Sequence, residues 1–176
     1  MSPWSSLQTR YRESRVVRWT VDFGVLGAML VAIGGYQTRS HPRGSPPEVA
    51  LTTLDGKRVR LSQYAGKPTL VAVWAPWCGV CKMDGDNISR VRGWLGDRAR
   101  VISIAAAYGE RSAVDRYIRE QHVDYPVLLA GPNFQQQLGV HAFPSFFVMD
   151  ETGRVTTSTQ GYTTTLGLWL RVLLGG

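Results

Sequence analysis

The chain has 176 residues, a formal net charge of +7 and only two cysteines. This length predicts one domain with a short extension, and a hydrophobic content of 44% argues against a largely disordered chain. Two cysteines exclude a disulfide-rich scaffold and any metal site with four thiolate ligands. The first 45 residues hold six arginines and two acidic residues, whereas the other 131 hold fourteen basic and eleven acidic residues. Because more than half of the charge excess lies in this flank, we predict no nucleic-acid partner.

An apolar segment follows the first arginines. Residues Phe23 to Tyr36 carry no charge, and extension back to Val16 gives 21 residues that include Arg18 and Asp22. A membrane-spanning helix needs about 20 residues, and two opposite charges four residues apart can pair on one helix face. Four arginines precede the segment and two follow it, which favours a cytoplasmic N-terminus. We predict a retained signal anchor, and the alternatives are a cleaved signal peptide and a buried helix of a soluble domain.

The domain organisation follows from this segment and from the composition after it. Residues 37–47 hold three prolines, a glycine and two serines, which is typical of a linker. The predicted parts are a short cytoplasmic N-terminus over residues 1–15, a single N-terminal transmembrane helix over 16–36, the linker over 37–47 and a folded domain over 48–176. The domain is then expected outside the cytoplasm, where thiol–disulfide chemistry is normal.

The pattern within the domain alternates between strands and helices. The expected elements, in chain order, are a β-hairpin over 49–61, a buried strand over 69–74, a helix over 78–96, a strand over 101–107, a helix over 112–122, a short strand over 126–130, a short helix over 133–138, a hairpin formed by 145–150 and 155–160, and a helix over 163–174. A β-hairpin, a βαβα run and a final ββα run predict an α/β fold with a mixed sheet.

Helical spacing also predicts which side chains the longer helices bury. In the helix over 78–96 the expected core positions are Met83, Ile88, Val91, Trp94 and Leu95. In the last helix they are Leu166, Leu170, Leu173 and Leu174, and Trp169 is also expected in the core.

The two cysteines lie at the join between the buried strand and the helix, as Cys78-Gly-Val-Cys81. A cysteine at a helix start faces unpaired backbone N–H groups, which favour its thiolate, the attacking species in disulfide exchange. We therefore predict that Cys78 is the nucleophile and Cys81 the resolving thiol. Covalent haem attachment would need a histidine where Lys82 stands, and zinc would need two further ligands. The two thiolates are also suited to Cu(I), so a copper-binding or copper-delivery protein remains an alternative.

The motif Trp74-Ala-Pro-Trp77-Cys78-Gly-Val-Cys81 after a buried strand resembles the thioredoxin superfamily. The upstream segment from Leu54 to Pro68 is similar to its extracytoplasmic, membrane-tethered branch. That branch contains the TlpA/ResA-like and cytochrome c maturation reductases and the suppressor-for-copper-sensitivity D-type proteins. The resemblance implies a thioredoxin fold over residues 48–176. It also implies a redox-active disulfide in place of a bound cofactor, and a role linked to copper tolerance. Peroxidase activity is not expected, because Ala75 stands where peroxiredoxins need Thr or Ser.

A second motif, Val140-His-Ala-Phe143-Pro144-Ser145, stands where this superfamily has its cis-proline. The resemblance implies that Pro144 is cis, and that Pro144, Phe143 and Trp77 form the substrate-binding surface. Many thioredoxins carry a buried acid two residues before the first tryptophan of the motif, whereas this chain has Ala72. Asp84 and water are the candidate replacements as the proton acceptor.

The resemblance further implies partners and a location. The expected partners are protein thiol and disulfide substrates and a membrane thiol electron donor of the DsbD type. The expected location is the bacterial inner membrane, with one span and the catalytic domain in the periplasm. A reductase or isomerase is expected, and a thiol oxidase is the alternative, because Gly79-Val80 matches neither typical reductants nor strong oxidants.

Overall fold

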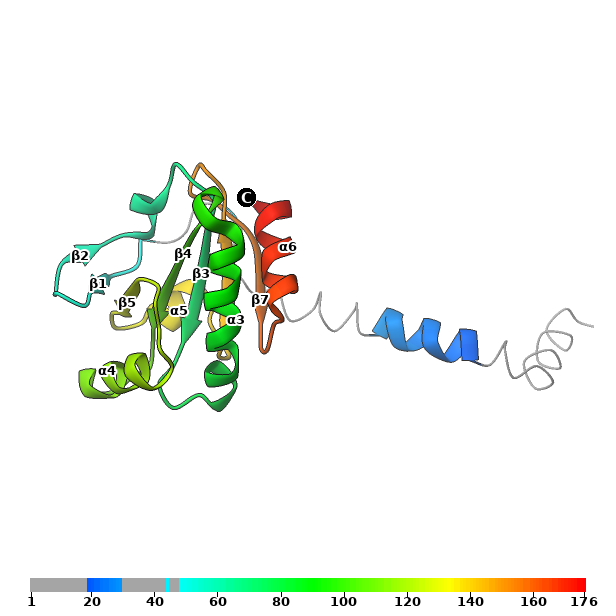
Figure 1. Ribbon diagram of the computed structural model, residues 1–176, viewed down its shortest axis with the longest axis horizontal. Helices are drawn as coiled ribbons and strands as arrows, with labels where there is room; N and C mark the ends of the chain where they lie inside the picture. The colour runs from blue at the N-terminus through cyan, green and yellow to red at the C-terminus, as the bar shows by residue number, and fades with distance from the viewer. Residues whose placement is uncertain (1–18, 30–43, 45–47) are drawn as a thin grey trace, which may run out of the picture. The chain divides into compact units, whose positions relative to one another are not determined.

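The computed structural model describes residues 19–29, 44 and 48–176, which fall into two units, 1–39 and 40–176 (Figure 1). Within the first unit, residues 19–29 are helical. No helix in these ranges has the length and apolar character needed to cross a membrane. Both ends of the predicted span over 16–36, the predicted N-terminus over 1–15 and most of the linker over 37–47 lie outside the described residues.

The second unit is built on one mixed sheet of seven strands. The strands are β1 (Leu51–Thr53), β2 (Arg58–Val59), β3 (Thr69–Trp74), β4 (Arg100–Ala105), β5 (Val127–Ala130), β6 (Ser145–Met149) and β7 (Val155–Gln160). Their order across the sheet is β2-β1-β5-β4-β3-β6-β7. The helices are α3 (Gly79–Leu95), α4 (Arg111–Glu120), α5 (Phe134–Leu138) and α6 (Thr165–Gly175), with short 3₁₀ turns η1 (Leu61–Tyr64) and η2 (Gly96–Arg98). The predicted α/β class with a mixed sheet is confirmed.

Strand β3 lies at the centre because its side chains are apolar on both faces. All six of its residues are buried, and it pairs parallel with β4 and antiparallel with β6. Alternate residues belong to different cores. Val71 and Val73 pack with α5 and η1, whereas Leu70, Ala72 and Trp74 pack toward α3, α4 and α6. A strand covered on both faces has little freedom to shift, so the residues that follow it are held in place.

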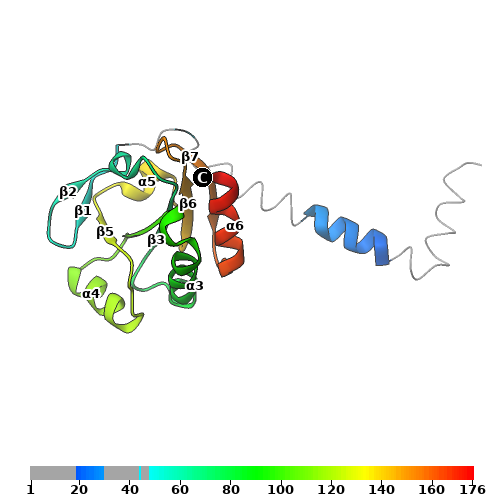
Figure 2. The ribbon, with the colours of Figure 1, turned by 45° about the horizontal axis from the view of Figure 1, so that its top comes forward.

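Helices α3 and α6 lie side by side on one face of the sheet in both views (Figures 1 and 2). Both run toward the end of the domain at which the C-terminus lies (Figure 1). Helix α3 continues without a break through Gly85, and Gly96 is its C-cap, with a positive φ of 52°. The N-terminus of α3 therefore lies at the opposite end of the domain from the C-terminus of the chain.

The predicted core stripe of α3 is wrong at two positions. Met83 and Trp94 are exposed, whereas Asp84 and Asn87 are buried beside Ile88 and two other apolar residues of the stripe. The periodicity of the apolar residues cannot reveal this register, because two of the inward positions are polar. These two side chains accept hydrogen bonds from the segment that begins α6.

The predicted stripe of α6 is also wrong. Leu168 and Val172 face the sheet, whereas Leu166, Leu170, Leu173 and Leu174 are exposed, and Trp169 is half-buried. The helix is apolar almost all round, so the apolar pattern fits more than one orientation about its axis. Contacts of Leu168 and Val172 with Leu70, Phe146 and Ile88 fix the orientation that is observed.

Candidate active site

Cys78 and Cys81 form a disulfide at the start of α3, with their Cα atoms 5.3 Å apart. Cys78 is the N-cap residue, and its Sγ accepts a hydrogen bond from the backbone N–H of Cys81 at 3.1 Å. The Cys78 amide in turn donates to the carbonyl of Ala75 at 3.0 Å, which closes a tight turn after β3. A sulfur at the N-cap lies at the positive end of the helix, where a thiolate is stabilised by the first N–H groups.

The surroundings of the two sulfurs differ. Cys78 is 6% exposed and Cys81 is 1% exposed, and both pack in a cluster with Trp74, Val114 and Tyr117. The Tyr117 hydroxyl donates to the carbonyl of Cys81 at 2.9 Å, and its ring stacks on Trp74 with centroids 4.0 Å apart. Burial raises the pKa of the Tyr117 phenol, so the hydroxyl keeps the proton that it donates. The second cysteine is thus covered and held by a contact from α4, and the first is the more exposed of the two residues.

The Trp77 side chain is exposed next to the dithiol. It is 68% exposed, and its indole N–H donates to the carbonyl of Ala107 at 2.8 Å. Ala107 follows β4 with a φ of +46°, which is rare for a residue with a Cβ. The Phe143 ring meets the Trp77 ring edge to face, with centroids 5.6 Å apart. The structure therefore brings together two of the three residues predicted to form the substrate-binding surface.

The third of these residues, Pro144, lies next to the end of β3. The Phe143–Pro144 bond is cis, and Val73 pairs with Ser145 across the β3–β6 ladder. The Pro144 carbonyl accepts from the amide of Gly161, and the Ser145 hydroxyl donates to Ala142 at 2.7 Å. Pro144 is buried and Phe143 is half-buried against the cluster that contains both cysteines. The roles assigned to Trp77, Phe143 and Pro144 in substrate binding stay predictions.

Asp84 lies one helical turn after Cys81 and is fully buried. Its Oδ1 accepts from the side-chain amide of Asn87 at 3.2 Å and from the amide of Thr163 at 3.3 Å. Its Oδ2 has no hydrogen-bond partner among the described residues. Burial raises the pKa of this carboxyl, and the two hydrogen bonds oppose that shift only in part. Many thioredoxins have their buried acid on the strand, at the position that Ala72 occupies here. This chain instead has a buried acid on α3.

Other charged groups near the site point elsewhere. The Lys82 ammonium lies 3.7 Å from a carboxylate oxygen of Glu120 on α4, and both side chains are largely exposed. His141 is exposed on the loop before Phe143.

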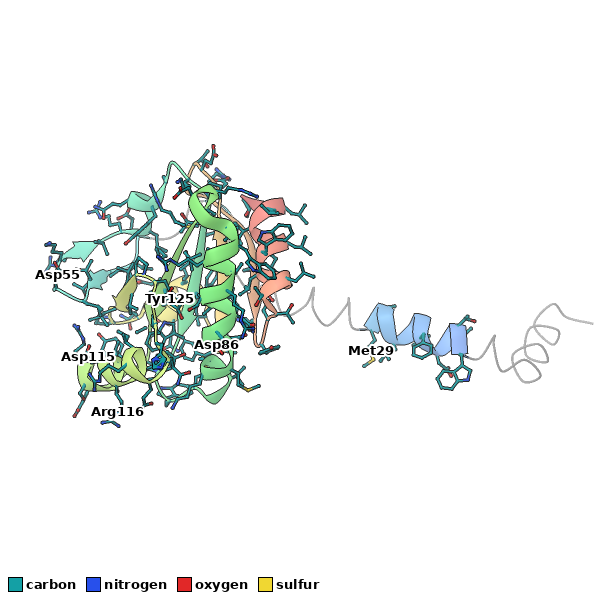
Figure 3. All side chains as sticks on the ribbon, viewed as in Figure 1. Met29, Asp55, Asp86, Asp115, Arg116 and Tyr125 are labelled. Atoms are coloured by element: carbon teal, nitrogen blue, oxygen red, sulfur yellow. A yellow bond between two sulfur atoms is a disulfide. The ribbon has the colours of Figure 1, made fainter. Side chains whose placement is uncertain are left out.

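A groove beside Trp77, between α3 and α4, is lined by Pro76, Tyr108 and Arg116 among others, and Figure 3 labels Arg116 on α4. Tyr108 and Tyr117 were missed as site residues, because their partners are backbone carbonyls on other elements.

The described residues offer few candidate metal ligands. No group of three or more His, Cys, Asp or Glu side chains that would hold a metal ion is found among them. In the oxidised pair neither sulfur is a free thiolate. The predicted copper alternative stays a prediction that rests on the dithiol alone.

Known proteins resemble this chain over most of its length. The thioredoxin-like protein YneN of Bacillus subtilis (strain 168) is 26% identical over 141 residues, which is 74% of this chain and 83% of that protein. The thiol-disulfide oxidoreductase ResA of Bacillus thuringiensis subsp. konkukian is 24% identical over 151 residues, covering 84% of this chain and 86% of ResA. The crystal structure of a putative thiol:disulfide interchange protein DsbE from Chlorobium tepidum superposes with a TM-score of 0.68. The two sequences are 19% identical, and the superposition covers 77% of this chain and 98% of the Chlorobium chain. This superposition shows that the two proteins share a fold.

A thioredoxin-like fold with a disulfide-forming cysteine pair at the start of α3 defines a thiol–disulfide oxidoreductase. The Redoxin family model matches residues 42–166, which is more than half of the chain. The chain therefore belongs to the Redoxin family, and its relatives within it are of the ResA and DsbE type.

The buried carboxyl of Asp84 makes a prediction about stability and pH. Because burial raises its pKa in the folded state, the folded chain binds more protons than the unfolded chain just above the ordinary Asp pKa. The free energy of unfolding should therefore fall as the pH rises through the folded-state pKa. Asp84→Asn removes this dependence. The free energy of unfolding of the variant, minus that of the parent, should therefore be larger at about pH 7 than at about pH 4. Urea denaturation at both pH values measures the difference.

The matched control is Asp86→Asn, because Asp86 is exposed on the same helix, as labelled in Figure 3. Among the described residues Asp86 pairs only with the exposed Arg90, so Asp86→Asn reports the effect of removing a surface carboxylate. A stability difference for Asp84→Asn that changes no more with pH than that of Asp86→Asn would contradict the prediction.

Proposed function

We propose that this protein reduces disulfides of extracytoplasmic proteins while anchored to a membrane by its N-terminal segment. The observation that carries the redox role is the hydrogen bond from the Cys81 amide to the Cys78 sulfur at the helix N-terminus. It supports Cys78 as the attacking thiolate and Cys81, which is covered and held by Tyr117, as the resolving thiol. The relatives named as thiol-disulfide oxidoreductases support the same chemistry.

In this proposal the reduced form donates two electrons to the substrate. The Cys78 thiolate attacks one sulfur of a substrate disulfide, which forms a mixed disulfide and releases one substrate thiolate. Cys81 then loses its proton and attacks the Cys78 sulfur. This step forms the Cys78–Cys81 disulfide and releases the second substrate thiol. A membrane thiol donor of the DsbD type would restore the reduced form.

Trp77 and Phe143 would hold the substrate chain during this exchange. Their rings meet edge to face beside Cys78. The indole N–H of Trp77 donates a hydrogen bond to the Ala107 carbonyl, which holds the indole in place. An exposed tryptophan beside a half-buried phenylalanine offers contact area to many sequences, which suits a protein with several polypeptide substrates.

The membrane location is supported by the sequence. Residues 23–36 lack charge, the arginines before them favour a cytoplasmic N-terminus, and residues 19–29 are helical. Together with the resemblance to tethered proteins, these features support one span in a bacterial inner membrane and a domain in the periplasm. Copper tolerance remains a prediction, because it rests on the family resemblance alone.

Replacement of the resolving cysteine tests the mechanism. Cys81→Ser should accumulate mixed disulfides between Cys78 and its substrates, because the sulfur that would release them is absent. Non-reducing electrophoresis of membranes from cells that express the full chain should show these adducts. They should disappear with reductant, and the single variant Cys78→Ser, which keeps Cys81, should show none. If Cys78→Ser accumulates adducts to the same extent as Cys81→Ser, the assignment of the nucleophile is wrong.

The direction of electron flow is tested by the reduction potential of the pair. A reductase should have a potential near about −270 mV, as thioredoxin does, whereas a strong oxidant such as DsbA lies near about −120 mV. Equilibration of the protein in glutathione or dithiothreitol redox buffers, read by thiol alkylation, gives the value. A result near the DsbA potential would favour the oxidase alternative.

We further propose that Asp84 accepts the proton that Cys81 loses. Its carboxyl is buried one turn away, one of its oxygens is unpartnered among the described residues, and its raised pKa makes it a stronger base than an exposed carboxylate. Asp84→Asn should lower kcat for insulin disulfide reduction, by about 10²-fold as is typical when a general base is lost. It should also remove the rise of kcat with pH that reports ionisation of Asp84. Asp86→Asn should keep both, and an unchanged pH profile in Asp84→Asn would refute this role.

A further inference from the structure

One surface of the domain is apolar although nothing in the described part of the chain covers it. It lies on α6 and on the neighbouring end of α3, and we call it the tryptophan–leucine face. Its members are Trp94, Leu166, Trp169, Leu170, Leu173 and Leu174. Leu174 is 84% exposed and Trp94 is 52% exposed. Soluble domains seldom expose so many large apolar side chains together, and those that do usually use them for binding.

The face is continuous across the two helices. Trp94 and Trp169 meet edge to face with ring centroids 6.4 Å apart, and with Leu166 and Arg98 they line one surface hollow. Positions 166, 170 and 174 are four residues apart, so they follow one side of α6. Leu168 and Val172 already supply the contacts of α6 with the core. The exposed leucines are therefore not needed to hold the helix on the sheet.

The charges on α6 itself have one sign. No acidic residue occurs between Thr152 and Gly176, and Arg171 is the charged residue of α6. On the neighbouring turn Arg98 lines the hollow beside Trp94, and Asp97 next to it is exposed. Tryptophan, leucine and arginine without carboxylates on the helix are typical of surfaces that lie in the headgroup region of a bilayer. Arginine side chains there meet the anionic phosphates of lipids.

The chain enters the domain on the same side as this face. Gly44 pairs with Val155 at the start of β7, through hydrogen bonds of 3.0 and 2.7 Å. The next residue, Thr156, donates to the carbonyl of Gly175 at the end of α6. The chain thus joins the domain beside the C-terminal end of α6. Fourteen residues connect the helix over 19–29 to Gly44. A chain segment of this length spans at most about 50 Å when it is fully extended.

This junction also lies far from the dithiol. Met149 pairs with Thr69 at the start of β3 and with Val155 at the start of β7. Cys78 follows the other end of β3, so Gly44 and Cys78 belong to opposite ends of the sheet. Helix α3 has 17 residues and spans about 25 Å from Cys78 to the end that carries Trp94.

We propose that the tryptophan–leucine face docks onto the phospholipid surface of the membrane in which the chain is anchored. This inference rests on the proposed anchor. A short tether keeps the face at a high effective concentration near the bilayer, so even weak interfacial affinity holds it there. In the docked state the dithiol end points away from the lipid surface and is open to soluble polypeptides. A second copy of the chain, or another protein, is the competing occupant.

Site-specific photocrosslinking of the full chain tests this docking. A benzoylphenylalanine replaces Leu170 or Leu174, and the protein is reconstituted in vesicles of phosphatidylethanolamine and phosphatidylglycerol. After irradiation, mass spectrometry identifies what each position has captured. We expect phospholipid adducts at 170 and 174 in at least fivefold excess over the control position Met83, which is exposed near the dithiol end of α3. Capture of a second copy or of another segment of the chain, or lipid capture no greater than at Met83, overturns the proposal.

A second variant tests the chemistry of the face. Trp94→Glu places a carboxylate on an exposed position of α3, so the fold should tolerate it, and it should lower lipid capture at 170 at least fivefold. Unchanged capture in this variant would count against docking. The same preparations report on the proposed function separately. Vesicle-bound protein that reduces insulin but captures no lipid refutes docking alone. Lipid capture without Cys78-dependent reduction refutes the redox role alone, and protein that vesicles do not retain refutes the anchor on which docking rests.

Discussion

The junction between β3 and α3 is the constraint on which the rest of the structure depends. A strand with six buried residues ends at Trp74, and four residues later a sulfur caps a helix of 17 residues. The strand cannot shift because both of its faces are covered, and the helix cannot rotate because its inward residues pack against the sheet. The packing of β3 and the packing of α3 together set the position of the N-cap. They therefore also set the orientation of Cys78 toward the first N–H groups of the helix.

The elements around the junction gain their roles from the same constraint. Strand β6 pairs with β3, so the loop that carries Phe143 and Pro144 must lie beside the start of α3. Strand β4 pairs with β3 from the other side, so the Ala107 carbonyl is within reach of the Trp77 indole. Three segments that are distant in the sequence thus form one site, because all of them flank a single strand end. This is the general reason why sites occur at the carboxyl ends of central strands in α/β sheets.

The sequence predicted the parts of this arrangement that depend on local patterns, and failed where partners are distant. The apolar run over 69–74 and the Cys-x-x-Cys spacing are local patterns, so the strand and the cysteine pair were identified directly. The inward face of α3 was not, because Asp84 and Asn87 occupy core positions that apolar periodicity rejects. The inward face of α6 was not, because that helix is apolar almost all round. Their hydrogen-bond partners, Thr163 and Thr165, lie 76 to 79 residues away. Only the folded chain shows that these polar residues have hydrogen-bond partners.

The same polar cluster connects the chemistry of the site to the opposite end of the domain. Asp84 binds the amide of Thr163 and Asn87 binds the hydroxyl of Thr165, so the first turn of α6 is fixed on α3 one turn beyond the dithiol. With that turn fixed, Leu168 must face the sheet, and helical spacing then directs Leu166, Leu170 and Leu174 outward. A buried carboxyl beside Cys81 and an exposed row of leucines are therefore two consequences of one contact. Selection for a base near the resolving cysteine would preserve the orientation of α6, and with it the face that we assign to the membrane.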